Sequence, residues 1–272
     1  MKRVSIKIFV LALSCLFCSL HADKIDDYTD FALASNLNKT GQYELAKQKL
    51  EKIVTNRNNK KFVQACFMLA NYYFESRKDV EKDRIKAVKY YNMVLKAIQS
   101  KAEAGNAEAQ YITSICFKNA KYNSKIAFEW LEKSATQGYA PAQAKLAFYY
   151  MKGTGVKADF KKAVEWAEKA SNQNNMLGRA ILGSYYLNVK KDKSKGFTFI
   201  KQSADAGNAG GQYMLYRCLY YGKGTKKDRK KARELLQKAA DQGLDDAVTK
   251  SRIINTRRKA KKKKSKSVLA KK

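Results

Sequence analysis

Histidine and proline are almost absent from this 272-residue chain, which holds one of each, His21 and Pro141. With a single proline, helices can run for many residues without interruption. His21 lies in an N-terminal segment with the pattern of a cleaved export signal, so we expect a mature chain without histidine. Such a chain cannot use a Ser-His-Asp or Cys-His nucleophile, an HExxH zinc site or imidazole acid–base chemistry.

The export signal is predicted from residues 1–22. Three basic residues open it, and the apolar run IFVLALSCLFCSL that follows is short for a bilayer span. Leu20 and Ala22 suit the positions before a cleavage site, which places the mature start at Asp23. We therefore expect an exported protein, periplasmic or secreted, with no transmembrane span in the mature chain. A lipid anchor on one of the signal's two cysteines, or an uncleaved anchor, is less favoured.

Acidic residues are scarce, with 24 against 56 lysines and arginines and a net charge of +32. The excess predicts attraction to anionic surfaces and says little about the fold. It peaks in residues 251–272, which hold eleven basic and no acidic residues. We expect this segment to be disordered, as a solubilising tail or as a tether to an anionic lipid or envelope polymer. No aromatic residue is interleaved there for base stacking, so nucleic acid is the less favoured partner. The candidate anion-binding residues are Arg257, Arg258, Lys259, Lys261, Lys262, Lys263, Lys264 and Lys266.

A repeated pattern fills the centre of the chain. Segments such as AGNAEAQYITSICF, QGYAPAQAKLAFYY and AGNAGGQYMLYRCLYY each open on a small residue, and successive markers are 33 or 36 residues apart. Within a unit, apolar residues recur at helical spacing, as Ala142, Leu146 and Tyr149 do, and a second helical pattern follows. The sequence therefore predicts pairs of helices. The markers are Gly105, Gly138, Asn174, Gly207 and Gly243.

Two of the units are longer because they connect their helices through a Gly-x-Gly turn, KGTGVKAD or YGKGTKKD. A glycine-rich turn beside lysines could cradle a phosphate, but phosphate loops follow a strand and have a different glycine spacing. We interpret Gly153-Thr154-Gly155 and its counterpart Gly222-Lys223-Gly224 as connections between helices. Asp159, Asp192 and Asp228 are expected to cap the helices that follow.

The pattern continues in weaker form at both ends. Residues 28–54 suggest a tetratricopeptide-like hairpin that turns at Gly41, and QACFMLANYYF with DRIKAVKYYNMVLKA predicts another pair. Downstream, LDDAVTKSRIINT predicts a last helix, with Ala247, Ile253 and Ile254 as its apolar contacts.

The unit AQAKLAFYYMKGTGVKADFKKAVEWAEKA, residues 142–170, resembles the Sel-one-like repeat, a relative of the tetratricopeptide repeat. The resemblance is strong over residues 104–243. It implies an all-α fold, a right-handed α/α solenoid of about six helix-turn-helix repeats that presents a concave surface to other proteins. Residues 23–103 would be degenerate repeats, 104–250 Sel-one-like repeats with a capping helix, and 251–272 the basic tail.

A cysteine-rich branch of that family is linked to β-lactam binding and hydrolysis, with a disulfide closing each hairpin. Here the second helices lack the required cysteines, and Ser-x-x-Lys, the serine nucleophile motif, is absent. We expect Cys66, Cys116 and Cys218 to be buried free thiols. The sequence predicts a protein that is not an enzyme, with no catalytic residue, metal or cofactor, and the β-lactam activity stays as an alternative.

Gln110, Gln143 and Gln212 recur at one position of the first helix. They could line a partner-binding surface or serve as a structural hydrogen-bonding position, and the sequence does not decide between these roles. The resemblance implies an exported adaptor that binds a protein or peptide in its solenoid groove. A secreted effector acting on a host protein is the alternative.

Overall fold

The computed structural model describes residues 29–75 and 79–256, and its elements are α-helices joined by short connections. They form helical hairpins that stack into a solenoid, so the predicted all-α solenoid of about six repeats is confirmed. A last helix covers residues 245–256. The six hairpins are residues 29–39 with α2 (Tyr43–Ile53), α3 (Phe62–Phe74) with α4 (Arg84–Glu103), α5 (Ala107–Asn119) with α6 (Ser124–Thr136), α7 (Ala140–Lys152) with α8 (Phe160–Asn172), α9 (Met176–Asn188) with α10 (Lys193–Asp205), and α11 (Ala209–Tyr221) with α12 (Arg229–Asp241).

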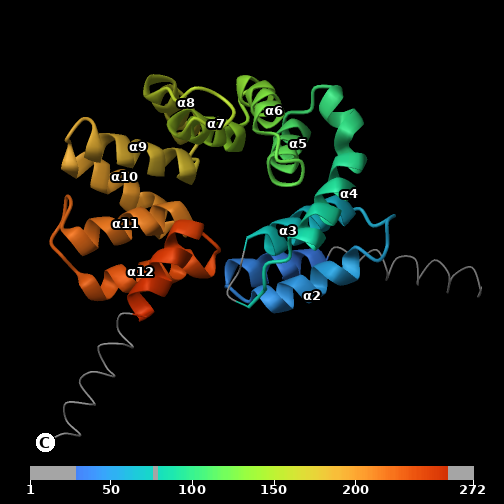
Figure 1. The fold of residues 1–272 in the computed structure, drawn as a ribbon, viewed down its shortest axis with the longest axis horizontal. Coiled ribbons are helices and arrows are strands. Elements are labelled where there is room, and N and C mark those ends of the chain that lie inside the picture. Colours follow the sequence, from blue (N-terminus) through green and yellow to red (C-terminus); the bar gives the residue numbers. More distant parts are fainter. Residues whose placement is uncertain (1–28, 76–78, 257–272) are drawn as a thin grey trace, which may run out of the picture.

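In the C-terminal half of the stack the first helices lie closer together than the second helices. There α9 packs against both α7 and α11, whereas α8, α10 and α12 make no comparable contacts with one another. The first helices α7, α9 and α11 therefore lie on the inner side of the curvature in this half. The hairpins follow an arc that brings α12 back towards α2 (Figure 1). Residues 38–41 and 206–207 line a common hollow of about 650 Å³ there.

The second helices begin where the sequence predicts. The carboxylate of Asp159 accepts hydrogen bonds from the backbone amides of Lys161 and Lys162 at 3.0 Å. Asp192 and Asp228 make the corresponding bonds at the starts of α10 and α12. Each cap supplies an acceptor to amides that have no partner within the first turn of the helix. The three predicted caps are confirmed.

The Gly-x-Gly turns are helix connections, as predicted. Gly153 ends α7 and Gly222 ends α11, both in the left-handed conformation with φ of 69° and 74°. Gly155 is also left-handed, with φ of 70°, and a Cβ there would collide with the carbonyl of Ser124. Glycine is needed at Gly155 for conformation and for close approach to the preceding hairpin.

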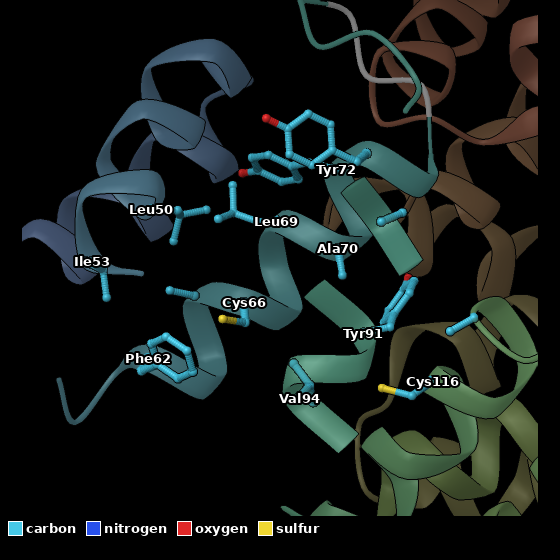
Figure 2. Packing of buried hydrophobic residues seen from close by; sticks show 14 of the residues in the cluster. Leu50, Ile53, Phe62, Cys66, Leu69, Ala70, Tyr72, Tyr91, Val94 and Cys116 are labelled. Carbon is cyan, nitrogen blue, oxygen red and sulfur yellow. The ribbon is translucent and has the colours of Figure 1, made fainter. Parts of the chain in front are cut away.

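The core runs along the whole stack, and its N-terminal part is shown in Figure 2. Leu69, Tyr91 and Val94 are fully buried there, and the hydroxyl of Tyr91 donates to Asn71 Oδ1 at 2.7 Å. Tyrosine suits such a core because the ring fills volume while the hydroxyl finds a partner. Cys66, Cys116 and Cys218 are buried free thiols, as predicted.

The last helix forms over the segment LDDAVTKSRIINT, as predicted, and ends at residue 256. Residues 251–256, which the predicted domain bounds place in the basic tail, are therefore helical. Ala247 is fully buried and Ile254 packs against the last core cluster, but Ile253 is 42% exposed and does not serve as an apolar contact. Residues 1–22 and 257–272, which carry the predicted signal and the candidate anion-binding residues, lie outside the described residues.

Candidate functional site

A groove crosses the inner side of the stack over three successive first helices, α7, α9 and α11. Its volume is about 630 Å³, within the range of small-ligand and peptide sites. Phe148 and Met151 of α7, Tyr185 of α9 and Met214 of α11 line it, and none of the four is fully buried. Phe148, Met151 and Met214 also pack against the core clusters, and the parts of these side chains that stay exposed give the groove an open apolar surface.

Small residues form part of the groove lining. Ala180 and Ser184 of α9 line it beside Gly210 of α11. Large side chains at these three positions would occupy the hollow. At the end where α7 and α9 finish, Phe160 and Val189 also line the groove and are 60% and 55% exposed.

The charged side chains of the groove are mostly basic. Lys145, Lys152 and Arg217 line it, and Asp246 is the one acid among the lining residues. Burial lowers the pKa of the Lys145 ammonium group, opposed by Glu75 and reinforced by Lys118. An anionic group in the groove would offset the cost of desolvating this ammonium group.

Metal and thiol chemistry depend on where the acidic and cysteine side chains of the described residues lie. Within residues 29–75 and 79–256 no three histidine, cysteine or acidic side chains gather where they could hold a metal ion. Burial raises the pKa of Cys66 to about 11, of Cys116 to about 12 and of Cys218 to about 11, so the thiols stay protonated at neutral pH.

Among the described helices, none is both long and apolar enough to cross a membrane.

The family model for the Sel1 repeat matches residues 63–93, 107–139, 140–175, 176–208 and 209–244, more than half of the sequence. The chain belongs to the Sel1 repeat family. The first match lies in the segment predicted to hold degenerate repeats, and the others coincide with the regular hairpins α5 to α12. Sel1 repeats are typically scaffolds for protein–protein interaction.

Two solved structures from Pseudomonas aeruginosa share the fold. Protein PA5086 of Pseudomonas aeruginosa is 20% identical, with a TM-score of 0.52, and immunity protein Pa5087 of the same organism is 23% identical, with a TM-score of 0.51. Both alignments cover 80% of this chain and 84% of the other. A Sel1 repeat protein from Oxalobacter formigenes is 22% identical, with a TM-score of 0.47 and coverage of 82% and 86%. A comparison with curated proteins found no match.

In this Sel1 repeat protein, the three repeated glutamines lie inside the stack and outside the groove. Gln110, Gln143 and Gln212 are 5%, 5% and 6% exposed. Each accepts a hydrogen bond from a glutamine just after the second helix of its own hairpin, at 2.7, 2.9 and 2.9 Å; these donors are Gln137, Gln173 and Gln242. These internal hydrogen bonds explain why glutamine recurs at this position of the first helix. Contact of the three glutamine side chains with a partner stays a prediction.

In the regular hairpins, the first-helix glutamine and its partner after the second helix are either both present or both replaced. In the α9–α10 hairpin Arg179 stands at the first position and Ala206 at the second, so both members are replaced together. The pair also reaches neighbouring backbone, because Gln143 donates to the carbonyl of Ala135 at 3.3 Å and Gln173 to that of Gly138 at 3.0 Å. These amides therefore link the end of one hairpin to the beginning and end of the next.

Proposed function

We propose that this Sel1 repeat protein is an exported scaffold that binds a segment of a partner protein in the groove across α7, α9 and α11. The observation that carries the proposal is the open apolar lining of that groove, formed by Phe148, Met151, Tyr185 and Met214. Partly exposed aromatic and methionine side chains are enriched at the centres of protein interfaces. The pattern of residues 1–22 supports export.

The basic rim defines the chemistry of the partner segment. Lys145, Lys152 and Arg217 border the apolar lining, with Asp246 as the one acid beside them. A segment with apolar anchors and neighbouring carboxylates would bury its anchors in the hollow and pair its charges at the rim. We therefore propose an acidic, apolar segment as the occupant.

Site-specific photocrosslinking in cells tests the groove. A photoreactive residue in place of Tyr185 lies in the groove, and one in place of Glu165 lies on an exposed part of α8 outside it. We expect a defined crosslinked partner from position 185 that is absent from position 165 and is lost when Arg217→Glu is added. Identical products from both positions would contradict binding in the groove.

Export is tested separately by cell fractionation with N-terminal sequencing. The proposal expects protein outside the cytoplasm that begins at Asp23. Full-length protein confined to the cytosol would contradict export and leave the groove proposal standing.

A further inference from the structure

The stacked hairpins have two distinct edges. The connections inside the α7–α8 and α11–α12 hairpins pack on the start of the second helix of the preceding hairpin. Gly155 lies against Ser124, and a Cβ on Gly224 would lie 2.7 Å from the carbonyl oxygen of Lys193. The connections between hairpins meet at the opposite edge, where Gln242 donates to the carbonyl of Gly207 at 3.0 Å. The connections α9–α10 and α11–α12 lie on the outer side of the arc (Figure 1).

Charge is distributed unequally between these edges. We define the loop edge as the four segments that surround the connections inside the regular hairpins. Together they hold sixteen lysines and arginines against three aspartates, and those aspartates cap helices. The connections at the opposite edge, residues 103–109, 136–142, 172–178, 205–211 and 241–247, hold six acids and no lysine or arginine. The loop-edge segments are residues 119–126, 152–162, 188–196 and 221–231.

Each loop-edge segment also exposes one large apolar or aromatic side chain. Tyr122 is 58% exposed, Phe160 60%, Val189 55% and Tyr221 49%. They account for four of the eight large hydrophobic side chains exposed among the described residues. Regular repetition along a single edge distinguishes them from the scattered apolar residues that most protein surfaces carry.

Two loop-edge residues adopt a backbone conformation that their side chains disfavour. Tyr122 and Lys191 have φ of 52° and 61°, and each directly precedes the cap of a second helix, Asn123 or Asp192. Glycine or asparagine would fit this left-handed conformation with less strain. The two shorter connections thus place the Tyr122 ring and the Lys191 ammonium group at the loop edge although the backbone conformation is unfavourable for both residues.

We propose that the loop edge docks on the surface of an anionic lipid bilayer. Lysines and arginines near a membrane are attracted by the negative surface potential, and aromatic or aliphatic side chains beside them enter the headgroup region. The loop edge supplies both kinds of side chain in each of four successive hairpins. This surface belongs to the folded repeats and is distinct from residues 257–272. It adjoins the groove and shares Lys152, Phe160 and Val189 with it.

Co-sedimentation of the full-length protein with vesicles of equal parts phosphatidylglycerol and phosphatidylcholine tests the charges. Lys121→Gln, Lys157→Gln and Lys226→Gln are combined in one variant, which removes one exposed cation from each of three loop-edge segments. A matched variant loses the same charge from the C-terminal halves of second helices and keeps the same C-terminal tail. We expect about tenfold or greater loss of binding for the edge variant and less than about twofold for the control. The control substitutions are Lys101→Gln, Lys201→Gln and Lys238→Gln.

A second pair of variants tests the apolar side chains at constant charge. Tyr122→Gly with Tyr221→Ser removes two rings that do not line the groove. Leu45→Ser with Ile253→Ser removes two similarly exposed side chains elsewhere. We expect the first pair to weaken vesicle binding and the second to leave it unchanged.

Three outcomes would overturn the proposal. One is the absence of binding by the full-length protein, and another is equal weakening by the edge and control charge variants. The third is a combination of two results. The Tyr122→Gly, Tyr221→Ser variant would bind vesicles as tightly as the unaltered protein, and the edge charge variant would lose the same factor in affinity for vesicles and for a single-stranded oligonucleotide. That result would assign the edge to a linear polyanion.

Discussion

At the scale of single residues, Thr113 departs from the repeat in a way that affects stability. The other four Sel1 hairpins have leucine at this position of the first helix, at Leu69, Leu146, Leu182 and Leu215. Thr113 is 3% exposed, and its hydroxyl has no hydrogen-bond partner among the described residues. A buried hydroxyl without a partner lowers stability, because it loses its bonds to water and gains none.

Replacing Thr113 with valine should therefore stabilise the fold. Thr113→Val keeps the shape and removes the hydroxyl, so we expect the free energy of unfolding in urea to rise by about 1 kcal/mol. Thr136→Val is the control, because the Thr136 hydroxyl donates to the carbonyls of Glu132 and Lys133 at 3.0 Å, and no gain is expected there. A loss of stability in Thr113→Val would contradict an unpaired hydroxyl.

The three buried thiols predict a pH dependence. Burial raises the pKa of Cys116 to about 12, whereas an unfolded thiol titrates near about 8.5. Between these values the unfolded chain loses thiol protons that the folded protein retains, so the free energy of unfolding should fall as the pH rises above about 8.5.

Thiol labelling measures the same property directly. In the folded protein at pH 9, Cys66, Cys116 and Cys218 should react with iodoacetamide far more slowly than in the denatured chain. Labelling at the denatured rate would show that the thiols are accessible and ionised, contrary to their burial.

At the scale of elements, the connection inside the α7–α8 hairpin fixes the contact between hairpins. Gly155 and Gly138 both have positive φ, at 70° and 89°. A Cβ on Gly138 would meet nothing within 4 Å, whereas one on Gly155 would meet the backbone of Ser124. A substitution at Gly138 therefore measures the loss of stability from the left-handed backbone alone, and one at Gly155 adds the loss from the collision with Ser124.

Alanine substitution at the two glycines should give unequal losses of stability. Gly138→Ala should cost about 1 kcal/mol from the left-handed backbone alone. Gly155→Ala adds a collision that requires two hairpins to move apart, so we expect a loss at least twice as large, measured by thermal or urea unfolding. Equal losses would contradict the close packing of this turn on α6.

The helices and their ends could be predicted from sequence because they depend on nearby residues. Asp159 caps α8 through amides two and three residues away, and Gly153 ends α7 within the same turn. The role of Gln143 could not be decided, since its partner Gln173 lies 30 residues away and the contact depends on how the hairpin closes. The prediction for Ile253 is wrong because, among the described residues, no hairpin follows the last helix to cover that side chain.

At the scale of the whole molecule, the groove and the loop edge arise from stacking. The groove uses first-helix positions that differ from one hairpin to the next, such as Lys145 with Met214 and Phe148 with Arg217, while core positions such as Leu146 recur. First-helix positions that vary between repeats, beside core positions that recur, were the sequence feature from which the groove could have been predicted. The sequence shows an excess of basic residues along the whole chain. The stacking of the hairpins gathers many of these residues on the loop edge, which the sequence alone does not show.

Binding of the partner segment in the groove is the central claim, and its affinity for the purified full-length protein tests it most directly. Arg217→Glu reverses a charge on the groove, and Arg233→Glu makes the same change at an exposed position of α12 outside it. We predict that the dissociation constant of the segment identified by crosslinking rises about tenfold for Arg217→Glu, about 1.4 kcal/mol, and changes less than about twofold for Arg233→Glu. Equal affinities for the two variants would contradict recognition of an acidic, apolar segment by this groove.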